Sequence, residues 1–257
     1  MKKILVKLGG TLLDQQESRL RLAHEITLAS DPERVFVVVH GGGKQMTRFL
    51  TERGVESQFI NGLRVTDPSV IDAVVKVFRG SVNSDLVTAF RAAGNRPVGL
   101  SGLDAGLVDA VILDPQLGQV GRPVASDARL LDVLTMTGYL PVVACIAGDS
   151  SGNIFNVNGD QMAVTCAASF HADQLFFLTD VDGVKGADGA VFPQLTVAEC
   201  RKLIADGVAT GGMQAKLESA IDAILKGVGE VLIAPGAHVG IVEKLLDHAP
   251  IGTRILR

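Results

Sequence analysis

Short apolar runs rich in β-branched residues alternate with helical patterns along almost the whole chain, and this alternation constrains the fold most. The runs at 4–8 and 34–43 are apolar on successive residues, as strands are when helices cover both faces of a parallel sheet. Between them, Leu20, Ala23 and Thr27 recur at helical spacing. Such alternation builds a mostly parallel sheet with helices on both sides. The sequence therefore predicts an α/β protein, a three-layer αβα sandwich around an open central sheet.

The same pattern continues to the C-terminus without a long linker, so two lobes that share one continuous sheet are favoured over two tethered domains. An Asn-Gly pair inside an alternating segment predicts a hairpin or an extended excursion at 56–67. The helix predicted at 68–94 is expected to bend near 79–83. The remaining predictions are strands at 97–102, 139–148, 174–180, 230–236 and 252–257, a second hairpin at 152–160, and helices at 18–30, 44–54, 125–138, 160–172, 196–207, 211–227 and 238–248.

Composition excludes several classes of function. The net charge is −4 with histidine neutral, so no overall basic field favours nucleic acid or an anionic membrane. No apolar run approaches the roughly 20 residues of a membrane span, and the N-terminus lacks the features of a signal peptide. Cys145, Cys166 and Cys200 are odd in number, have no CxxC spacing and lie in apolar stretches, which predicts buried reduced thiols. We expect a soluble, cytoplasmic protein.

Three glycine-bearing turns follow predicted strands: "KLGGT" at 7–11, "HGGGK" at 40–44 and "TDVDGV" at 179–184. In an open α/β sheet, ligands bind beyond the carboxyl ends of the strands. Glycine lets the backbone approach a ligand closely, and the N-terminus of a following helix favours phosphate or carboxylate. Any one of these turns could be an ordinary tight turn. Three of them at one edge of the sheet favour an anion site.

The familiar phosphate-binding fingerprints are absent from this sequence. In "HGGGK" the position that a Walker A loop requires to be glycine is Val38, and Gln45 replaces the Ser or Thr. No GxGxxG follows a predicted strand, so a Rossmann dinucleotide site is not indicated. Any phosphate must therefore be bound in another way.

Four charged residues are candidates for that task, and each has a simpler alternative role. Lys7 lies in a strand expected to be covered on both faces, so it needs an anionic partner or an open cleft. Lys216 lies one turn into a helix and could instead belong to a solvated helix face. Asp160 stands at a predicted helix start, where it could act as an N-cap. Arg64 could be a rim residue of the hairpin.

Six motifs occur in an order and spacing that resemble the amino acid kinase family, and within it most closely the N-acetylglutamate kinases. They are "KLGG", "HGGG", "NGLRVTD", "NVNGDQMA", "LTDVDGV" and "GGMQAK", and with the terminal "GTRIL" the resemblance covers essentially the whole chain. "NGLRVT" together with "NVN.DQ" is the specific part. "KxGG" and "GG.K" are shared with carbamate kinases, aspartokinases and uridylate kinases.

The resemblance implies the amino acid kinase fold, with 1–168 as an N-terminal lobe that binds the amino-acid substrate and forms a homodimer, and 169–257 as the ATP lobe. It implies transfer of the γ-phosphoryl of ATP to the side-chain carboxylate of N-acetyl-L-glutamate, the second step of arginine biosynthesis. This carboxylate is already ionised at neutral pH, with a pKa of about 4.3, so no general base is needed. Mg²⁺ is expected to be carried by ATP oxygens and water, without protein ligands.

The resemblance also implies a role for each site residue. Lys7 and Lys216 would flank the transferring phosphoryl group, and Asp160 would orient both lysines. The long helix after Pro68 is a candidate for the dimer surface. The further residues are Gly9, Gly10 and Gly41 for the phosphate; Gly42, Gly43, Arg64, Asn156 and Asn158 for the substrate; and Thr179, Asp180, Val181, Asp182, Gly183, Val184, Lys185, Val208, Ala209, Thr210, Gly211 and Gly212 for ATP.

Two departures and two alternatives accompany this interpretation. Ser84 follows Asn83 where many relatives are expected to have lysine, and "GLSGLDAG" is similar to kinases of carrier-linked aminoadipate or glutamate. The retained "NGLRVT" and the net negative charge favour free N-acetylglutamate over such substrates. A non-catalytic nucleotide or amino-acid sensor is the alternative of another class, although it would not need both lysines and Asp160. The resemblance implies that arginine-inhibited relatives have an extra N-terminal helix, which joins their dimers into hexamers. Here the first predicted strand begins almost at Met1, so weak or absent arginine inhibition is expected.

Overall fold

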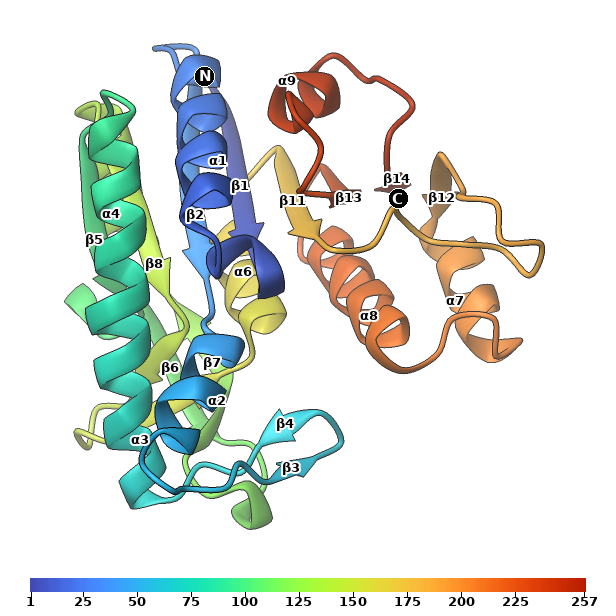
Figure 1. Ribbon diagram of the computed structural model, residues 1–257. Helices are drawn as coiled ribbons and strands as arrows, with labels where there is room; N and C mark the ends of the chain where they lie inside the picture. The colour runs from blue at the N-terminus through green and yellow to red at the C-terminus, as the bar shows by residue number, and fades with distance from the viewer.

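An eight-stranded sheet runs through the whole molecule in the order β12-β14-β13-β11-β1-β2-β8-β5 (Figure 1). The structure is a computed structural model that describes residues Met1–Arg257. Neighbouring strands are parallel except for the antiparallel pair β13 and β14, which confirms a mostly parallel sheet. The strands are β1 (Lys2–Leu8), β2 (Arg34–His40), β5 (Pro97–Ser101), β8 (Leu140–Ala144), β11 (Gln174–Thr179), β12 (Gln194–Thr196), β13 (Glu230–Pro235) and β14 (Thr253–Leu256).

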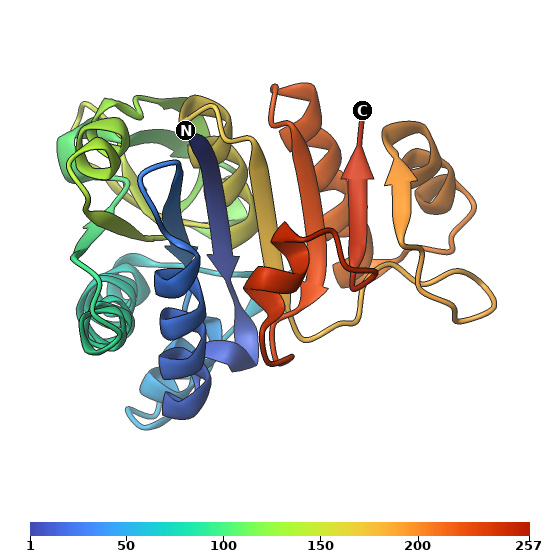
Figure 2. The ribbon, with the colours of Figure 1, turned by 90° about the horizontal axis from the view of Figure 1, so that it is seen from above.

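Helices cover both faces of this sheet, so the predicted three-layer arrangement is confirmed (Figure 2). One layer contains α1, α4 and α9, and α1 packs against both of the others. The other contains α5, α6, α7 and α8, with α6 lying against β1, β2 and β11 and packing on α8. None of the helices is both long and apolar enough to span a membrane. Their bounds are α1 (Gln16–Ala29), α4 (Asn83–Ala92), α5 (Arg129–Met136), α6 (Gly159–Ser169), α7 (Val197–Ala205), α8 (Gly211–Leu225) and α9 (Ile241–Leu246).

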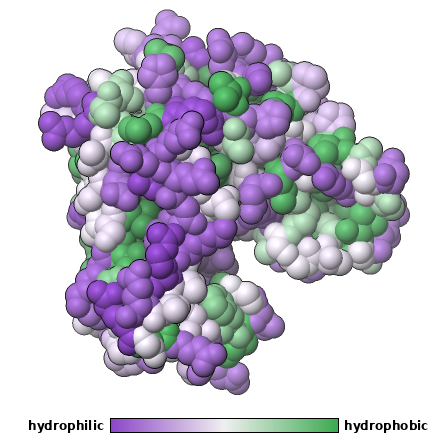
Figure 3. Space-filling view, in the orientation of Figure 1, coloured by the Kyte–Doolittle hydropathy of each residue, from purple (hydrophilic) through white to green (hydrophobic).

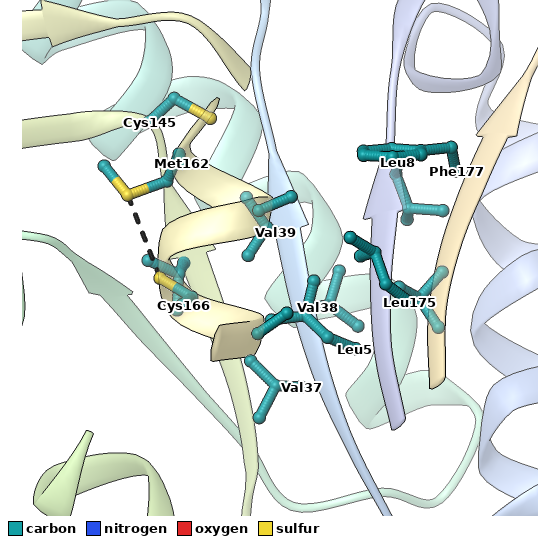
Figure 4. Close-up of a cluster of buried hydrophobic side chains, with 14 of the residues drawn as sticks. Leu5, Leu8, Val37, Val38, Val39, Cys145, Met162, Cys166, Leu175 and Phe177 are labelled. Carbon is teal, nitrogen blue, oxygen red and sulfur yellow. Dashed lines mark hydrogen bonds between the residues drawn. The ribbon is translucent and has the colours of Figure 1, made fainter. Parts of the chain in front are cut away.

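The core lies where α6 covers the central strands (Figure 4). Leu5 of β1, Val37 of β2 and Leu175 of β11 are in register on this face and fully buried there. Burial of each such side chain contributes about 1.5–3 kcal/mol. On the α6 side, Cys166 Sγ lies 3.9 Å from Met162 Sδ. All three cysteines are free and buried, which confirms the prediction made from their apolar surroundings.

A small closed barrel beside the sheet was not predicted. It consists of β10 (Ile154–Val157), β7 (Val120–Ser126), β6 (Val108–Ile112) and β9 (Ile146–Gly148). The strand predicted at 139–148 is in fact two strands, β8 and β9, separated at Cys145. Strand β7 carries weak local signals because it contains Pro123 and Gly121, and a β-carbon at Gly121 would lie 2.6 Å from Phe155 Cβ. The short strand β12 was also missed.

Two local predictions are confirmed in detail. The hairpin pairs β3 (Phe59–Ile60) with β4 (Leu63–Arg64), and Asn61 and Gly62 have the positive φ values, 49° and 78°, that a type I′ turn requires. The long helix runs from α3 (Pro68–Val74) into α4 through a π-helical stretch, Val75–Val82, which overlaps the segment where a bend was expected; the bend itself stays a prediction. The other short elements are α2 (Gly43–Thr51) and the 3-10 turns η1 (Gly10–Leu13), η3 (Asp104–Gly106) and η4 (Pro115–Leu117).

The predicted lobes share the central sheet, since β5, β8, β2 and β1 come from 1–168 and the remaining four strands from 169–257. The predicted boundary between the lobes, after residue 168, falls at the C-terminal end of α6. This helix packs against strands of both lobes. The division into lobes with separate functions stays a prediction.

Candidate active site

Two lysines from distant parts of the chain meet at one carboxylate. Lys7 Nζ, near the end of β1, lies 2.7 Å from Asp160 Oδ1. Lys216 Nζ, on α8, lies 3.2 Å from Asp160 Oδ2. The three side chains are only 14%, 20% and 12% exposed for Lys7, Lys216 and Asp160. A solvated helix face therefore does not describe Lys216, and Lys7 has the anionic partner that its position in a covered strand demands.

The charges in this cluster favour an anion. Burial by itself would raise the pKa of Asp160, but the charges and hydrogen bonds of Lys7 and Lys216 together outweigh burial and lower the pKa below its ordinary value. Asp160 is consequently ionised at neutral pH and is a weak base. Two ammonium groups and one carboxylate leave a net positive charge in a poorly solvated site, where it attracts phosphate strongly.

Asn158 caps α6, so the Asp160 carboxylate is not needed as the cap and can pair with the two lysines. Its Oδ1 accepts hydrogen bonds from the backbone N–H groups of Asp160, at 2.9 Å, and Gln161, at 3.2 Å. The alternative role of Asp160 as the N-cap is therefore wrong, because Asn158 fills it. With the cap supplied two residues earlier, the Asp160 carboxylate faces the lysines instead of its own helix.

A cavity of about 220 Å³ adjoins the lysine–aspartate cluster. Its walls come from both glycine loops of the N-terminal lobe, from the β3–β4 hairpin and from the end of β10. A volume of this size suits one small polar ligand. Lys216 and Asp160 do not line it. Lys7 does, together with the eight other residues predicted for the substrate or the phosphate, namely Gly9, Gly10, Gly41, Gly42, Gly43, Arg64, Asn156 and Asn158.

Arg64 is held rigidly in the wall of this cavity. Its Nη2 donates to Thr47 Oγ1 at 2.7 Å and to the Gly43 carbonyl at 3.1 Å, and its Nη1 donates to Ser57 Oγ. The guanidinium also lies over the Phe59 ring, 4.7 Å from its centroid. Arg64 is only 8% exposed, so the alternative of a rim residue is wrong. A preorganised guanidinium of this kind is suited to bind a carboxylate.

The residues predicted for ATP lie outside the cavity. Thr179–Lys185 follow the end of β11 and Val208–Gly212 precede α8, and none of them lines the 220 Å³ space. Figure 3 shows a notch in the surface between the part that carries the β3–β4 hairpin and the part that carries α7 and α8 (compare Figure 1). Within the ATP segment, Val184 N donates to Thr253 Oγ1 at 2.8 Å, which ties the loop to β14.

Sequence reasoning missed Phe78 and Gly159, which shape the cavity. A β-carbon at Gly42 would lie 2.8 Å from the buried Phe78 ring, so the loop and the π-helical stretch fit closely only with glycine. A β-carbon at Gly159 would lie 3.2 Å from Lys7 Cε. Gly159 is the glycine of the motif "NVNG", so this motif could have indicated its close approach to Lys7. No local pattern marked Phe78, because its partner is 36 residues away.

The sequence is similar to known proteins over almost its whole length. The chain is 56% identical over 254 residues to the acetylglutamate kinase of Solibacter usitatus, with 99% of each protein covered. It is 39% identical over 270 residues to the acetylglutamate kinase of Allorhizobium ampelinum, covering 99% of this chain and 91% of that protein.

Solved structures give the same picture of the fold. An N-acetylglutamate synthase from Neisseria gonorrhoeae, complexed with coenzyme A and N-acetyl-glutamate, matches all of this chain and 59% of its own, with a TM-score of 0.87 and 25% identity. A carbamate kinase from Giardia lamblia bound to AMP-PNP has a TM-score of 0.74 at 18% identity, covers 100% of this chain and 98% of its own, and supports the fold alone. Residues 2–235 match the sequence model of the amino acid kinase family. With the fold, the cluster of lysines and the relatives in agreement, this chain belongs to the amino acid kinase family.

Proposed function

We propose that this protein transfers the γ-phosphoryl group of ATP to the side-chain carboxylate of N-acetyl-L-glutamate, giving N-acetyl-L-glutamyl 5-phosphate and ADP. The observation that carries the proposal is the meeting of Lys7 and Lys216 at Asp160, beside a cavity that presents Arg64 and two glycine loops. The relatives named acetylglutamate kinase, up to 56% identical, support this choice of substrate and a role in arginine biosynthesis.

The chemistry suits the residues present. A carboxylate oxygen of the substrate forms a bond to the γ-phosphorus, and the bond from that phosphorus to the β–γ bridging oxygen breaks, so ADP leaves with the electron pair. The acceptor needs no general base, because it is already ionised. The obstacle is the repulsion between an anion and a polyanion. Lys7 and Lys216 offset this charge, and Asp160 keeps both ammonium groups in place.

Arg64 is proposed to bind the α-carboxylate of the amino-acid substrate. Three of its five N–H donors are used by Ser57, Thr47 and Gly43, which leaves Nε–H and one Nη1–H for a ligand. Asn156 lines the same cavity, with its Nδ2 bonded to Thr66 Oγ1 at 3.1 Å, and its Oδ1 is proposed to accept a hydrogen bond from the substrate amide.

ATP is proposed to bind to the C-terminal lobe through Thr179–Lys185 and Val208–Gly212, with its phosphates directed toward Lys216. Mg²⁺ would then be held by nucleotide oxygens and water. Each oxygen of Asp160 already contacts a lysine ammonium, so this carboxylate does not suit a magnesium ligand. When bound, the ion would reduce the negative charge of the phosphates.

A homodimer is proposed as the working form, with the helix after Pro68 as a candidate interface. Strand β5 supports this idea, because it is an edge strand whose free backbone groups lie next to that helix. A cytoplasmic location is also proposed, since three buried unpaired cysteines suit a reducing compartment. Light scattering at micromolar concentration checks the dimer, and a hexamer or a monomer there would exclude it.

Trapping of the acyl phosphate with hydroxylamine tests the function. N-acetylglutamate, N-acetylaspartate and N-acetylaminoadipate should be compared side by side with MgATP, and the hydroxamate and ADP should form in equal amounts. We expect the highest kcat/KM with N-acetylglutamate. A preference for the aminoadipate analogue would replace the substrate, and the absence of any turnover would favour a sensor.

A further inference from the structure

His40 is a fully buried polar residue at the end of β2, immediately before the glycine loop Gly41–Gly43. Its Nδ1 lies 2.8 Å from the Gly41 carbonyl oxygen, and its Nε2 lies 2.9 Å from Asn83 Nδ2. A carbonyl oxygen only accepts and an amide nitrogen only donates. The ring is therefore neutral, with its hydrogen on Nδ1.

Asn83 holds the ring in this tautomer. Its Nδ2 also donates to the Val142 carbonyl at 2.8 Å, and its Oδ1 accepts from Arg79 Nη1 at 3.3 Å. These partners fix which end of the amide is the nitrogen. Arg79, from the π-helical stretch, lies 3.6 Å from Asp104 through its other Nη atom. A polar chain thus runs from the loop after β5 through the long helix to the glycine loop.

Burial and one neighbouring charge reinforce the neutral state of His40. Burial is the main influence that lowers the pKa of His40, to about 4; the bond to Gly41 opposes it, and the positive charge of Arg79 adds to it. The ring consequently keeps one N–H and one lone pair across the physiological pH range, and both are used.

The bond from His40 to the Gly41 carbonyl also orients the next backbone N–H, that of Gly42. The peptide that joins Gly41 to Gly42 is planar and trans, so its C=O and N–H point in opposite directions. When His40 holds the carbonyl, the Gly42 N–H points away from the imidazole ring. No backbone carbonyl accepts from this N–H, and Gly42 lines the 220 Å³ cavity.

We propose that His40 is a positioning residue, which aims the Gly42 N–H at the anion in the cavity by holding the Gly41 carbonyl. The proposal rests on the proposed function in that the anion is the transferring phosphoryl group or the attacking carboxylate. His40 itself touches neither. Asn83 contributes by keeping the ring in the Nδ1–H form.

Two substitutions separate positioning from simple core packing. In His40→Asn, the amide nitrogen can occupy the place of Nδ1 and keep the bond to Gly41. In His40→Gln, the amide lies one atom further out, near Asn83, and the Gly41 carbonyl loses its donor. Positioning predicts kcat within threefold of wild type for His40→Asn and a loss of tenfold or more for His40→Gln, with the KM for ATP within twofold in both. Packing predicts the reverse order, since glutamine is closer to histidine in volume.

The measurement is kcat and KM by hydroxamate formation, with Tm and the folded fraction recorded for each variant. A folded His40→Gln enzyme with kcat within threefold of wild type would overturn the proposal. So would a folded His40→Asn enzyme as impaired as His40→Gln.

NMR of the wild-type protein with ¹⁵N-labelled histidine gives a test that needs no variant. The Nδ1–H tautomer is expected at pH 7, and the Nε2–H tautomer or an imidazolium would overturn the proposal. A wild-type protein inactive on every acceptor would remove the proposed function alone. The positioning role would then be decided by the Gly42 amide resonance on addition of MgATP, which should shift in wild type and His40→Asn but not in His40→Gln.

Discussion

Gly9 faces the Lys7 ammonium so closely that a β-carbon at position 9 would lie 2.7 Å from Lys7 Nζ and 3.3 Å from Cε. The backbone of Gly9 is extended, with φ −134° and ψ 167°, a conformation open to any residue. Glycine is therefore required here for space and not for backbone freedom. The first glycine of "KLGG" leaves room for the lysine that precedes it by two residues.

Gly9→Ala should accordingly fold normally and lose activity. The added methyl group would push the Lys7 ammonium away from Asp160 and from the phosphoryl site. We expect kcat to fall about a hundredfold, which corresponds to about 3 kcal/mol of barrier, with Tm changed by only a few degrees. Steady-state kinetics and thermal unfolding check this, and a variant with wild-type kcat would show that Lys7 is not needed in this position.

Lys7→Ala and Lys216→Ala should each impair catalysis far more than stability. Asp160 keeps one ammonium partner in either variant, so no buried charge is left alone. A loss of about a thousandfold in kcat would correspond to about 4 kcal/mol. Lys202→Ala is the matched control, because Lys202 is 74% exposed and pairs only with Asp206. Near-normal kcat in either site variant would contradict the role assigned to that lysine.

Arg64→Ala should act mainly on the amino-acid substrate. Loss of charge-assisted hydrogen bonds worth about 1.5–3 kcal/mol predicts a roughly 10- to 100-fold increase in KM for N-acetylglutamate. The KM for ATP should stay close to that of wild type. Arg53→Ala serves as the control, since Arg53 is 53% exposed and contacts Phe49. An effect on ATP alone would refute the assignment of Arg64.

Stability should fall as pH decreases from about 6.5 to about 4 because of His40. The pKa of His40 is lowered from 6.5 to about 4 in the folded protein, so the unfolded chain binds the extra proton over this window. The free energy of unfolding therefore rises with pH across the window, by up to about 3 kcal/mol from this residue. Asp160, whose pKa is also lowered, contributes stability that is lost only as pH falls below its ordinary value of 3.8.

Denaturant unfolding at several pH values from 4 to 7.5 measures this effect. The slope of stability against pH should be smaller in His40→Asn than in wild type, by as much as one proton. Identical slopes would mean that His40 titrates normally in the folded protein. His24→Asn, at an exposed position of α1, tests whether the change is specific to the buried ring.

Most of the fold could be read from local pattern. Strands such as β2 are continuous apolar runs, and the turn of the β3–β4 hairpin follows from Asn61 and Gly62, because only a few residues accept positive φ at both positions. The barrel could not be read in this way: β9 and β10 fall within segments predicted to be extended, but β6 and β7 do not. Gly121 and Pro123 weaken the signal of β7, and the backbone partners that complete the barrel are supplied by distant segments.

The candidate site, like the fold, has features that follow from local sequence and features that need the folded chain. Local sequence was enough to predict the strand–helix alternation and the glycine loops, and the motifs marked Lys7, Asp160, Arg64 and Lys216 as candidates. Three features required the folded chain: the pairing of Asp160 with Lys7 and Lys216, the burial of Arg64, and the bond of His40 to Asn83. The contacts of Arg64 and His40 join residues far apart in the chain, so their geometry depends on how the helices pack. Asp160 likewise meets lysines from β1 and α8, while its own helix is capped locally by Asn158.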